Sequence, residues 1–196
     1  MRVRLLLVLM FPAVLPAQLH LTARVGIADH GGHARDVSDA DEPTFGPGVT
    51  RDASLALGVD RGPWRLGIVV RREAPDLVLA GHTSGIITRD ALEAWHGGVE
   101  LGRRVVGTPS RPTLHVVAGV GVTRWSFPGF DDPARNRLGG WLALDGALPV
   151  SGNLDGVLRL GFQRGASLFE EADLPEGYQS LAARRIELSL GLRWRR

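Results

Sequence analysis

Apolar and polar residues alternate with a period of two along most of the chain. In the C-terminal stretch, Ile186, Leu188, Leu190, Leu192 and Trp194 alternate with polar, charged or glycine residues. Successive side chains of a β-strand point to opposite faces of a sheet, so this pattern predicts strands with one apolar face. Eight such segments cover residues 19–28, 52–60, 64–72, 92–104, 113–125, 137–150, 153–164 and 185–196.

The connections between these segments alternate between long and short. The long ones are residues 29–51, 73–91, 126–136 and 165–184, and the short ones are 61–63, 105–112 and 151–152. Short turns at one end and longer loops at the other are typical of bacterial outer-membrane barrels, whose smallest usual strand number is about eight. The pattern therefore predicts an all-β fold, an eight-stranded antiparallel up-and-down transmembrane β-barrel with both mature termini on the periplasmic side.

The first residues have the composition of a secretory signal peptide. Arg2 and Arg4 precede an apolar run from Leu5 to Leu15, and small residues follow up to Ala17. This order is typical of an exported protein. We expect a signal peptide over residues 1–17 and one barrel domain over residues 18–196, because no linker divides the remainder.

The amino-acid composition further limits the class of protein to which the chain can belong. Cysteine is absent, which excludes disulfide bridges and thiolate metal sites. Two of the 23 basic residues lie in the predicted signal peptide, so the mature chain has as many basic residues as its 21 acidic ones and shows no excess charge for nucleic-acid binding. After the signal peptide, the longest apolar stretch covers residues 116–122, whereas a membrane helix needs about 20.

Alternation alone does not decide which face meets lipid. A soluble, exported, lipocalin-like barrel that binds an apolar ligand would show the same pattern with inside and outside reversed. The polar face carries many glycines between single large charged residues. Glycine weakens a strand but suits a narrow interior in which long side chains pack across small ones. We therefore predict that the apolar face lies in lipid.

Aromatic residues are expected in two interfacial girdles. The prediction places them at strand ends, the periplasmic ones being Trp64 and Trp194 and the outer ones Trp95, Trp125 and Phe162. Trp141 falls on the polar face of its segment, and a bulge at Gly139 and Gly140 would bring it to the apolar face.

Charged residues of the polar face would line the barrel interior. Buried charges are costly unless paired, and the interior of an eight-stranded barrel is just wide enough for side chains to fill. We expect a structural network of ion pairs rather than a small pore or proton path. Its predicted members are Arg24, Arg65, Glu100, Asp155, Arg159 and Glu187, accompanied by Asp52, Arg71 and Asp145.

Two stretches could carry other chemistry. Residues 29–42 contain possible ligands for a divalent cation, namely His30 and His33 with Asp29, Asp36, Asp39 and Asp41. Their spacing matches no defined metal site, so a solvated acidic loop is favoured. The same interpretation is favoured for residues 169–178. Residues 81–85, "GHTSG", contain a His-x-Ser arrangement that resembles the outer-membrane lipid A deacylases. The sequence does not locate a carboxylate beside the histidine that would orient it, so catalysis is not expected.

The final strand "IELSLGLRW" is similar to the C-terminal assembly signal of outer-membrane barrels, although Arg195 and Arg196 follow Trp194 and are expected in water. With the leader and the eight segments, the chain resembles the small eight-stranded outer-membrane β-barrel proteins, the group typified by the barrel domain of outer membrane protein A. This resemblance implies a bacterial outer-membrane location, contacts with membrane lipid and lipopolysaccharide, and delivery by the barrel-assembly machinery. It also favours a monomer with a structural, adhesive or loop-mediated binding role, without catalysis, cofactor, metal or nucleic acid.

Overall fold

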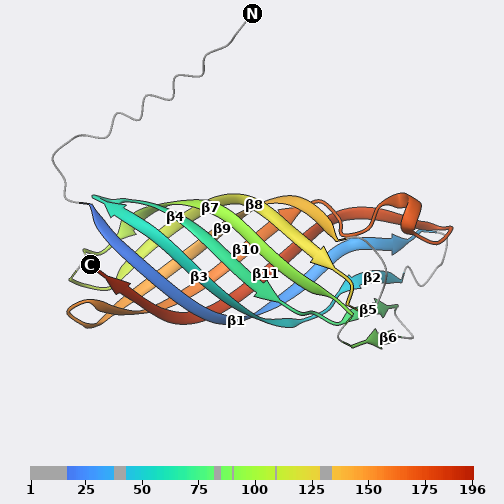
Figure 1. The fold of residues 1–196 in the computed structure, drawn as a ribbon, viewed down its shortest axis with the longest axis horizontal. Coiled ribbons are helices and arrows are strands. Elements are labelled where there is room, and N and C mark those ends of the chain that lie inside the picture. The colour runs from blue at the N-terminus through green and yellow to red at the C-terminus, as the bar shows by residue number, and fades with distance from the viewer. Residues whose placement is uncertain (1–16, 38–42, 82–84, 90, 109, 129–133) are drawn as a thin grey trace, which may run out of the picture.

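The computed structural model describes residues 17–37, 43–81, 85–89, 91–108, 110–128 and 134–196. Apart from Ala17, the predicted signal peptide lies outside these ranges. Eight strands form a closed antiparallel barrel (Figure 1), namely β1 (Gln18–Asp36), β3 (Thr50–Arg61), β4 (Trp64–Glu73), β7 (Glu93–Val106), β8 (Thr113–Ser126), β9 (Arg135–Ser151), β10 (Leu154–Gly165) and β11 (Tyr178–Arg195). Each predicted segment corresponds to one of these barrel strands.

The barrel closes where the last strand pairs with the first. Leu21 lies opposite Trp194 and Asp29 lies opposite Ile186, so the apolar positions of β1 and β11 are in register. Every other barrel strand pairs with its neighbours along the chain. Closure gives every barrel strand a partner on both sides and removes the free edges that an open sheet of these eight strands would expose. The predicted pairing between residues 19–28 and 186–194 is confirmed.

Three short strands extend the sheet beyond the barrel. β2 (Thr44–Pro47) pairs with β1, β5 (Leu77–Ala80) pairs with β2, and β6 (Gly85–Thr88) pairs with β5. They lie at the end of the barrel opposite to the C-terminus, which we call the loop end; the other is the terminal end (Figure 1). The described helical structure is a 3-10 turn, η1 (Glu171–Asp173), and no helix of the described residues is long and apolar enough to cross a membrane.

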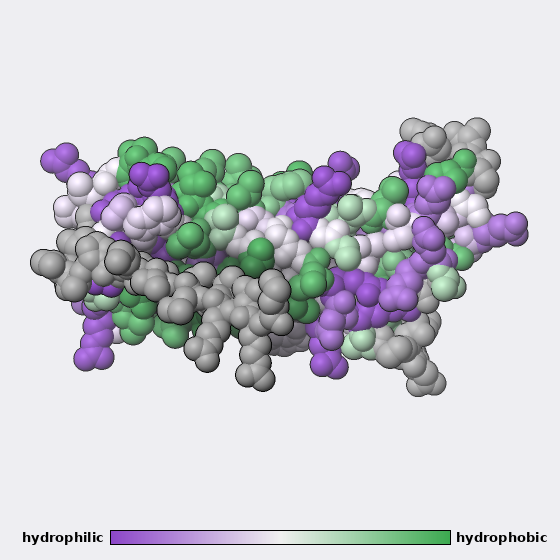
Figure 2. Space-filling view, turned by 90° about the horizontal axis from the view of Figure 1, so that it is seen from above, coloured by the Kyte–Doolittle hydropathy of each residue, from purple (hydrophilic) through white to green (hydrophobic). Residues whose placement is uncertain are grey.

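Side chains alternate between a charged interior and an apolar exterior. On β11, Ser189 is 3% exposed whereas its neighbour Leu190 is 62% exposed. Figure 2 shows hydrophobic residues gathered around the middle of the molecule and hydrophilic ones towards its ends. We call this outer surface the apolar belt; on the two closing strands it consists of Leu19, Leu21, Val25, Ile27, Ile186, Leu188, Leu190, Leu192 and Trp194.

Trp141 lies inside the barrel, so the predicted bulge is wrong. The register between β8 and β9 is continuous past Gly139 and Gly140, and Trp141 lies opposite Gly119. A β-carbon added at Gly119 would collide with the Trp141 ring, and the same is true at Gly98. The two glycines therefore create the space that the indole fills, as expected for a narrow interior.

Candidate functional site: the charged interior and the loop-end cap

All predicted members of the structural network lie inside the barrel. None of the six is more than 8% exposed: Arg24, Arg65, Glu100, Asp155, Arg159 and Glu187. The structure divides them into groups. Arg24, Glu100, Arg159 and Glu187 lie around the middle of the interior, whereas Arg65 and Asp155 line a cavity at the terminal end and have further partners there.

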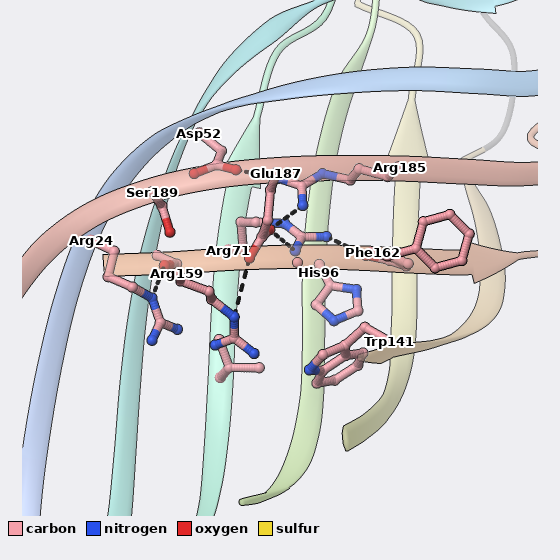
Figure 3. Close-up of a pocket in the computed structure, with 14 residues that line it drawn as sticks. Arg24, Asp52, Arg71, His96, Trp141, Arg159, Phe162, Arg185, Glu187 and Ser189 are labelled. Carbon is pink, nitrogen blue, oxygen red and sulfur yellow. Dashed lines mark hydrogen bonds and ion pairs between the residues drawn. The ribbon is translucent and has the colours of Figure 1, made fainter. Parts of the chain in front are cut away.

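Arg159 is the centre of the first group. Its Nη2 donates to Glu100 Oε2 at 2.9 Å. Its Nε lies 3.2 Å from Glu187 Oε1 and 3.5 Å from Asp145 Oδ1. Arg24 lies on the other side of Asp145, with Nη1 3.9 Å from Oδ2. One guanidinium thus neutralises carboxylates from β7, β9 and β11, and these contacts join opposite walls of the barrel. Figure 3 shows the contact between Arg159 and Glu187.

A second group lies closer to the loop end. Arg185 forms ion pairs with Asp52 and Glu187, and its Nε lies 3.0 Å from Glu73 Oε2. Arg71 Nη1 donates to Glu187 Oε2 at 3.1 Å, and its Nη2 donates to Gln163 at 2.7 Å. Glu187 therefore connects the two groups, as Figure 3 shows.

Arg185 and Glu73 were not among the predicted interior residues, although the alternation contains the signal for both. Positions an even number of residues apart on a strand have the same parity and face the same side of the sheet. Arg185 has the same parity as Glu187 on β11, and Glu73 has the same parity as Arg71 on β4. Arg185 is the first residue of a predicted segment, and Glu73 is the first residue of the connection predicted over residues 73–91. The parity of neighbouring strand positions would have placed both side chains inside.

Side chains fill most of the space around these groups. A cavity of about 20 Å³ remains between the central charges and Trp141, and another of about 30 Å³ lies near Glu73 and Trp125. A single water needs about 10–15 Å³ when volume is measured in this way. The first cavity therefore has room for about one or two waters and the second for about two or three. The middle of the described barrel is a packed polar core.

Apolar residues close the interior at the loop end. Buried side chains from β1, β7 and the two residues before it, β8 and the segment before η1 form a cluster that we call the cap. It consists of Ala34, Ala91, Leu92, Ala94, Trp125, Leu168 and Phe169. Leu168 is fully buried and Leu92 is 1% exposed. The Trp125 ring contacts the ring of His30, whose Nε2 lies 3.4 Å from Glu73. The cap therefore lies directly on the charged interior.

His33 connects β1 to the cap. Its backbone carbonyl accepts from Ser167 Oγ at 2.7 Å, and its Nδ1 accepts from the backbone N–H of Leu168 at 3.1 Å. The side chain is 1% exposed and lies beyond Ile27, where the apolar belt of β1 ends. Burial, with a smaller effect of the neighbouring His30, lowers the pKa of His33 to about 3. His33 is therefore neutral at physiological pH.

The prediction of a solvated loop over residues 29–42 is wrong for its first part. β1 continues to Asp36, and the side chain of His30 faces inwards like that of Arg24. A bulge between Gly31 and His33 shifts the alternation so that His33 is buried as well. Asp39 and Asp41 lie outside the described residues. In the part of the chain that the structure describes, no three metal-ligating side chains gather at one place. Residues 169–178 also differ from the prediction, because Phe169 is 7% exposed and belongs to the cap.

Four of the five predicted girdle aromatics lie on the outer surface. Their exposures lie between 42% and 48%: Trp64, Trp194, Phe162 and Trp95. Trp95 Nε1 donates to Glu93 at 3.2 Å, and Glu93 also accepts from Arg72 at 2.8 Å. An indole with one polar partner suits the interface between lipid and water. Trp125 was wrongly placed in the girdle, because its parity on β8 directs it inwards, where it is 4% exposed.

The terminal strand also differs from its prediction at one position. Arg195 was expected in water, but it is the last residue of β11 and is 9% exposed. It has the same parity as Ser189 and Arg193, so it points into the terminal end, where Nη2 lies 2.9 Å from Asp155 Oδ1. Arg196 is exposed, as predicted. The histidine and the serine of the His-x-Ser arrangement in residues 81–85 lie within residues 82–84, which are outside the described residues.

A closed eight-stranded barrel with a charged interior and an apolar exterior defines the class of small outer-membrane β-barrels. Leucine, valine and isoleucine side chains cover the outside at exposures such as 62% for Leu190 and 66% for Val25. A soluble lipocalin-like barrel would have this face inside. The fold and this surface together place the protein in a bacterial outer membrane.

Comparison with solved structures gives the same fold. Neisserial surface protein A superposes with a TM-score of 0.58 and 15% identity, over 91% of this chain and 98% of that one. The outer-membrane protease OmpT of Escherichia coli superposes with a TM-score of 0.51 and 9% identity, over 91% and 97%. No protein-family model matches the sequence, and no curated protein does either. The likeness to small outer-membrane barrels is therefore confirmed at the level of the fold.

Proposed function

We propose that the protein is a non-catalytic outer-membrane barrel that binds its partners through the surface at its loop end. The observation that supports this most strongly is the filled interior. Arg159 and Arg185 hold carboxylates from opposite walls, and the cavities left among them measure about 20 and 30 Å³. Such an interior is a structural core rather than a conduit for solutes. It leaves the ends and the lipid surface for function.

The loop end offers a surface that projects beyond the barrel. β2, β5 and β6 continue the sheet past β1, and β6 pairs on one side, with β5, and has no partner on its other side among the described residues. Ile86 and Ile87 on β6 are 62% and 63% exposed. A sheet edge with exposed apolar side chains is a surface onto which other molecules can dock. Adhesion or loop-mediated binding is the role that this arrangement supports.

Catalysis is not part of the proposal. Neisserial surface protein A and OmpT share the fold, and OmpT is a protease, so the fold alone does not decide. Ser167 and His33 lie together, but the serine hydroxyl donates to the histidine carbonyl rather than to its ring. Both side chains are at most 8% exposed. They hold the cap together and do not form a pair of nucleophile and base.

Contacts with the membrane follow from the same surfaces. We propose that the apolar belt contacts the lipid and lipopolysaccharide of the outer membrane and that the protein acts as a monomer. The terminal strand, with Leu190 and Trp194 facing outwards, is proposed as the segment that the barrel-assembly machinery recognises. The predicted signal peptide over residues 1–17 remains the proposed route of export.

Single-channel recording tests the closed interior. Protein reconstituted in planar bilayers should produce no conductance steps, because ion pairs and the cap obstruct the path. Regular steps of uniform size in the parent protein would contradict the proposal. Purified protein should also leave peptides and lipopolysaccharide intact, and turnover that scales with protein concentration would contradict the non-catalytic role.

Thiol labelling on intact cells tests whether the loop end faces outside. Thr88→Cys lies on β6, and Ser151→Cys lies at the last residue of β9, at the terminal end; both positions are exposed. A membrane-impermeant reagent should label Thr88→Cys and spare Ser151→Cys, and both should be labelled after lysis. The reverse pattern on intact cells would mean that the orientation is wrong.

A further inference from the structure

The terminal end of the barrel contains a cavity with a large excess of positive charge. Its volume is about 500 Å³, within the range of about 300–1,000 Å³ that is usual for small-molecule sites. Six arginines line it: Arg65, Arg104, Arg111, Arg193, Arg195 and Arg196. The carboxylates that line it are Asp60 and Asp155. This composition contrasts with the middle of the interior, where each arginine lies against one or more carboxylates.

The two carboxylates are already paired. Asp60 accepts from Arg65 at 2.7 Å, and Asp155 Oδ1 lies 2.9 Å from Arg195 Nη2. The other arginines of the cavity form no ion pair with a carboxylate of the described residues: Arg104, Arg111, Arg193 and Arg196. None of these four guanidinium groups therefore has a carboxylate of the described residues within ion-pair distance, and Asp60, Asp145 and Asp155 act on Arg193 only from farther away.

Arg193 is the most constrained of these four. It lies on β11 opposite Thr22 and is 2% exposed. Its Nε donates to Thr22 Oγ1 at 3.4 Å, which uses one of the five N–H groups of a guanidinium. Arg65 Nη1 and His115 Nδ1, which also line the cavity, are buried and have no hydrogen-bond partner. A buried guanidinium with no carboxylate at ion-pair distance is unfavourable, so an anion that enters here would be stabilised.

We propose that this cavity binds a phosphate-bearing anion. The planar guanidinium presents parallel N–H groups that match phosphate oxygens, and several such groups favour a ligand with more than one negative charge. Arg193 provides the buried end of the site, and the half-buried Arg104 and the exposed Arg111 provide its rim. The phosphate could belong to a lipid headgroup or to a soluble phosphate compound. Both present the same chemistry to the arginines.

Calorimetric titration of the purified full-length mature protein in a zwitterionic detergent tests this proposal. The probes are inorganic phosphate, dihexanoylphosphatidylglycerol and dihexanoylphosphatidylcholine, which has no net charge. Arg193→Gln removes the buried charge, and Arg111→Gln removes an exposed one without disturbing the packed strands. Arg51→Gln is the matched control, because Arg51 is exposed near the loop end of β3. Arg193→Gln should weaken binding at least about tenfold, and Arg51→Gln should leave it unchanged.

Each outcome decides the question. Phosphate binding that both cavity variants weaken indicates a soluble phosphate ligand. If phosphate fails to bind but phosphatidylglycerol binds with the same dependence on Arg193 and Arg111, the ligand is a lipid headgroup. The proposal is wrong if neither anion binds, if phosphatidylcholine binds as well as phosphatidylglycerol, or if Arg51→Gln weakens binding as much as the cavity variants. Should Arg193→Gln fail to fold, Arg111→Gln decides alone, with an expected loss of severalfold.

Discussion

The middle of the barrel and the cap close the same interior by opposite means. In the middle, Arg159 and Arg185 each contact three carboxylates, so charge is retained and balanced. In the cap, Leu92, Leu168 and Trp125 exclude water, and burial keeps His33 neutral. Charged side chains are therefore stable in the middle because each has partners of opposite charge, whereas a polar side chain in the cap, such as His33, is stable only when it is neutral.

This comparison predicts that removing one charge from the middle has the largest effect. Glu100→Leu leaves Arg159 without its closest partner, at 2.9 Å, and should lower the free energy of unfolding by about 3 kcal/mol. Glu171→Leu, which changes an exposed carboxylate beside the cap, should change it by less than about 0.5 kcal/mol. Urea unfolding in detergent, followed by tryptophan fluorescence, measures both. Equal midpoints would mean that Glu100 is solvated and that the middle is not a packed core.

A second pair of variants tests how tightly the middle is packed. Gly119→Ala introduces a β-carbon where the Trp141 ring lies, and overpacking of this kind should destabilise the barrel by about 1–3 kcal/mol. Gly97, on the neighbouring strand β7, has no atom within 4 Å of an added β-carbon, so Gly97→Ala should be neutral or slightly stabilising. The same unfolding assay compares them. If both alanine variants behave alike, Trp141 does not fill the space between Gly98 and Gly119.

The smallest expected effect is a loosening of the cap in acid. The pKa of His33 is about 3 in the folded protein, against about 6.5 in an unfolded chain. Because the opened state takes up a proton first, the free energy of opening should fall as pH decreases from about 6.5 towards about 3. Protonation at Nδ1 would also break the bond from Leu168 N–H. Amide exchange at Leu168, corrected for its intrinsic pH dependence, should show decreasing protection over this range.

His33→Asn provides the control for that measurement, because asparagine can still accept a hydrogen bond and does not titrate. Its protection at Leu168 should be independent of pH between about 4 and 7. A parent protein whose protection is equally flat would show that the cap does not depend on neutral His33.

Most of the correct predictions from the sequence came from the alternation of inward-facing and outward-facing positions along the strands. It placed Glu187 and Ser189 inside and Leu188 and Leu190 outside, and it located the strands that close the barrel. The errors arose where residue type was given more weight than parity. Trp125 was assigned to the interface because tryptophans prefer it, although its position on β8 faces inwards.

The remaining features depend on contacts between segments distant in the chain. Glu100 on β7 meets Arg159 on β10 across the interior, and such a partner follows from strand register and barrel tilt, which alternation does not contain. Burial of His33 requires Ser167 and Leu168, 134 and 135 residues further on. β2, β5 and β6 have four residues each, too few for a period of two to be recognised.

Spin labelling at Leu190 tests the central claim most directly, namely that the apolar face lies in lipid and the charged face forms a closed core. Leu190→Cys, labelled and reconstituted in bilayers, should collide frequently with oxygen and rarely with a water-soluble nickel chelate, because Leu190 lies in the middle of the apolar belt at 62% exposure. Thr108→Cys, exposed in the turn after β7, should show the opposite preference. A label at Leu190 that the nickel chelate reaches as readily as one at Thr108 would contradict the account.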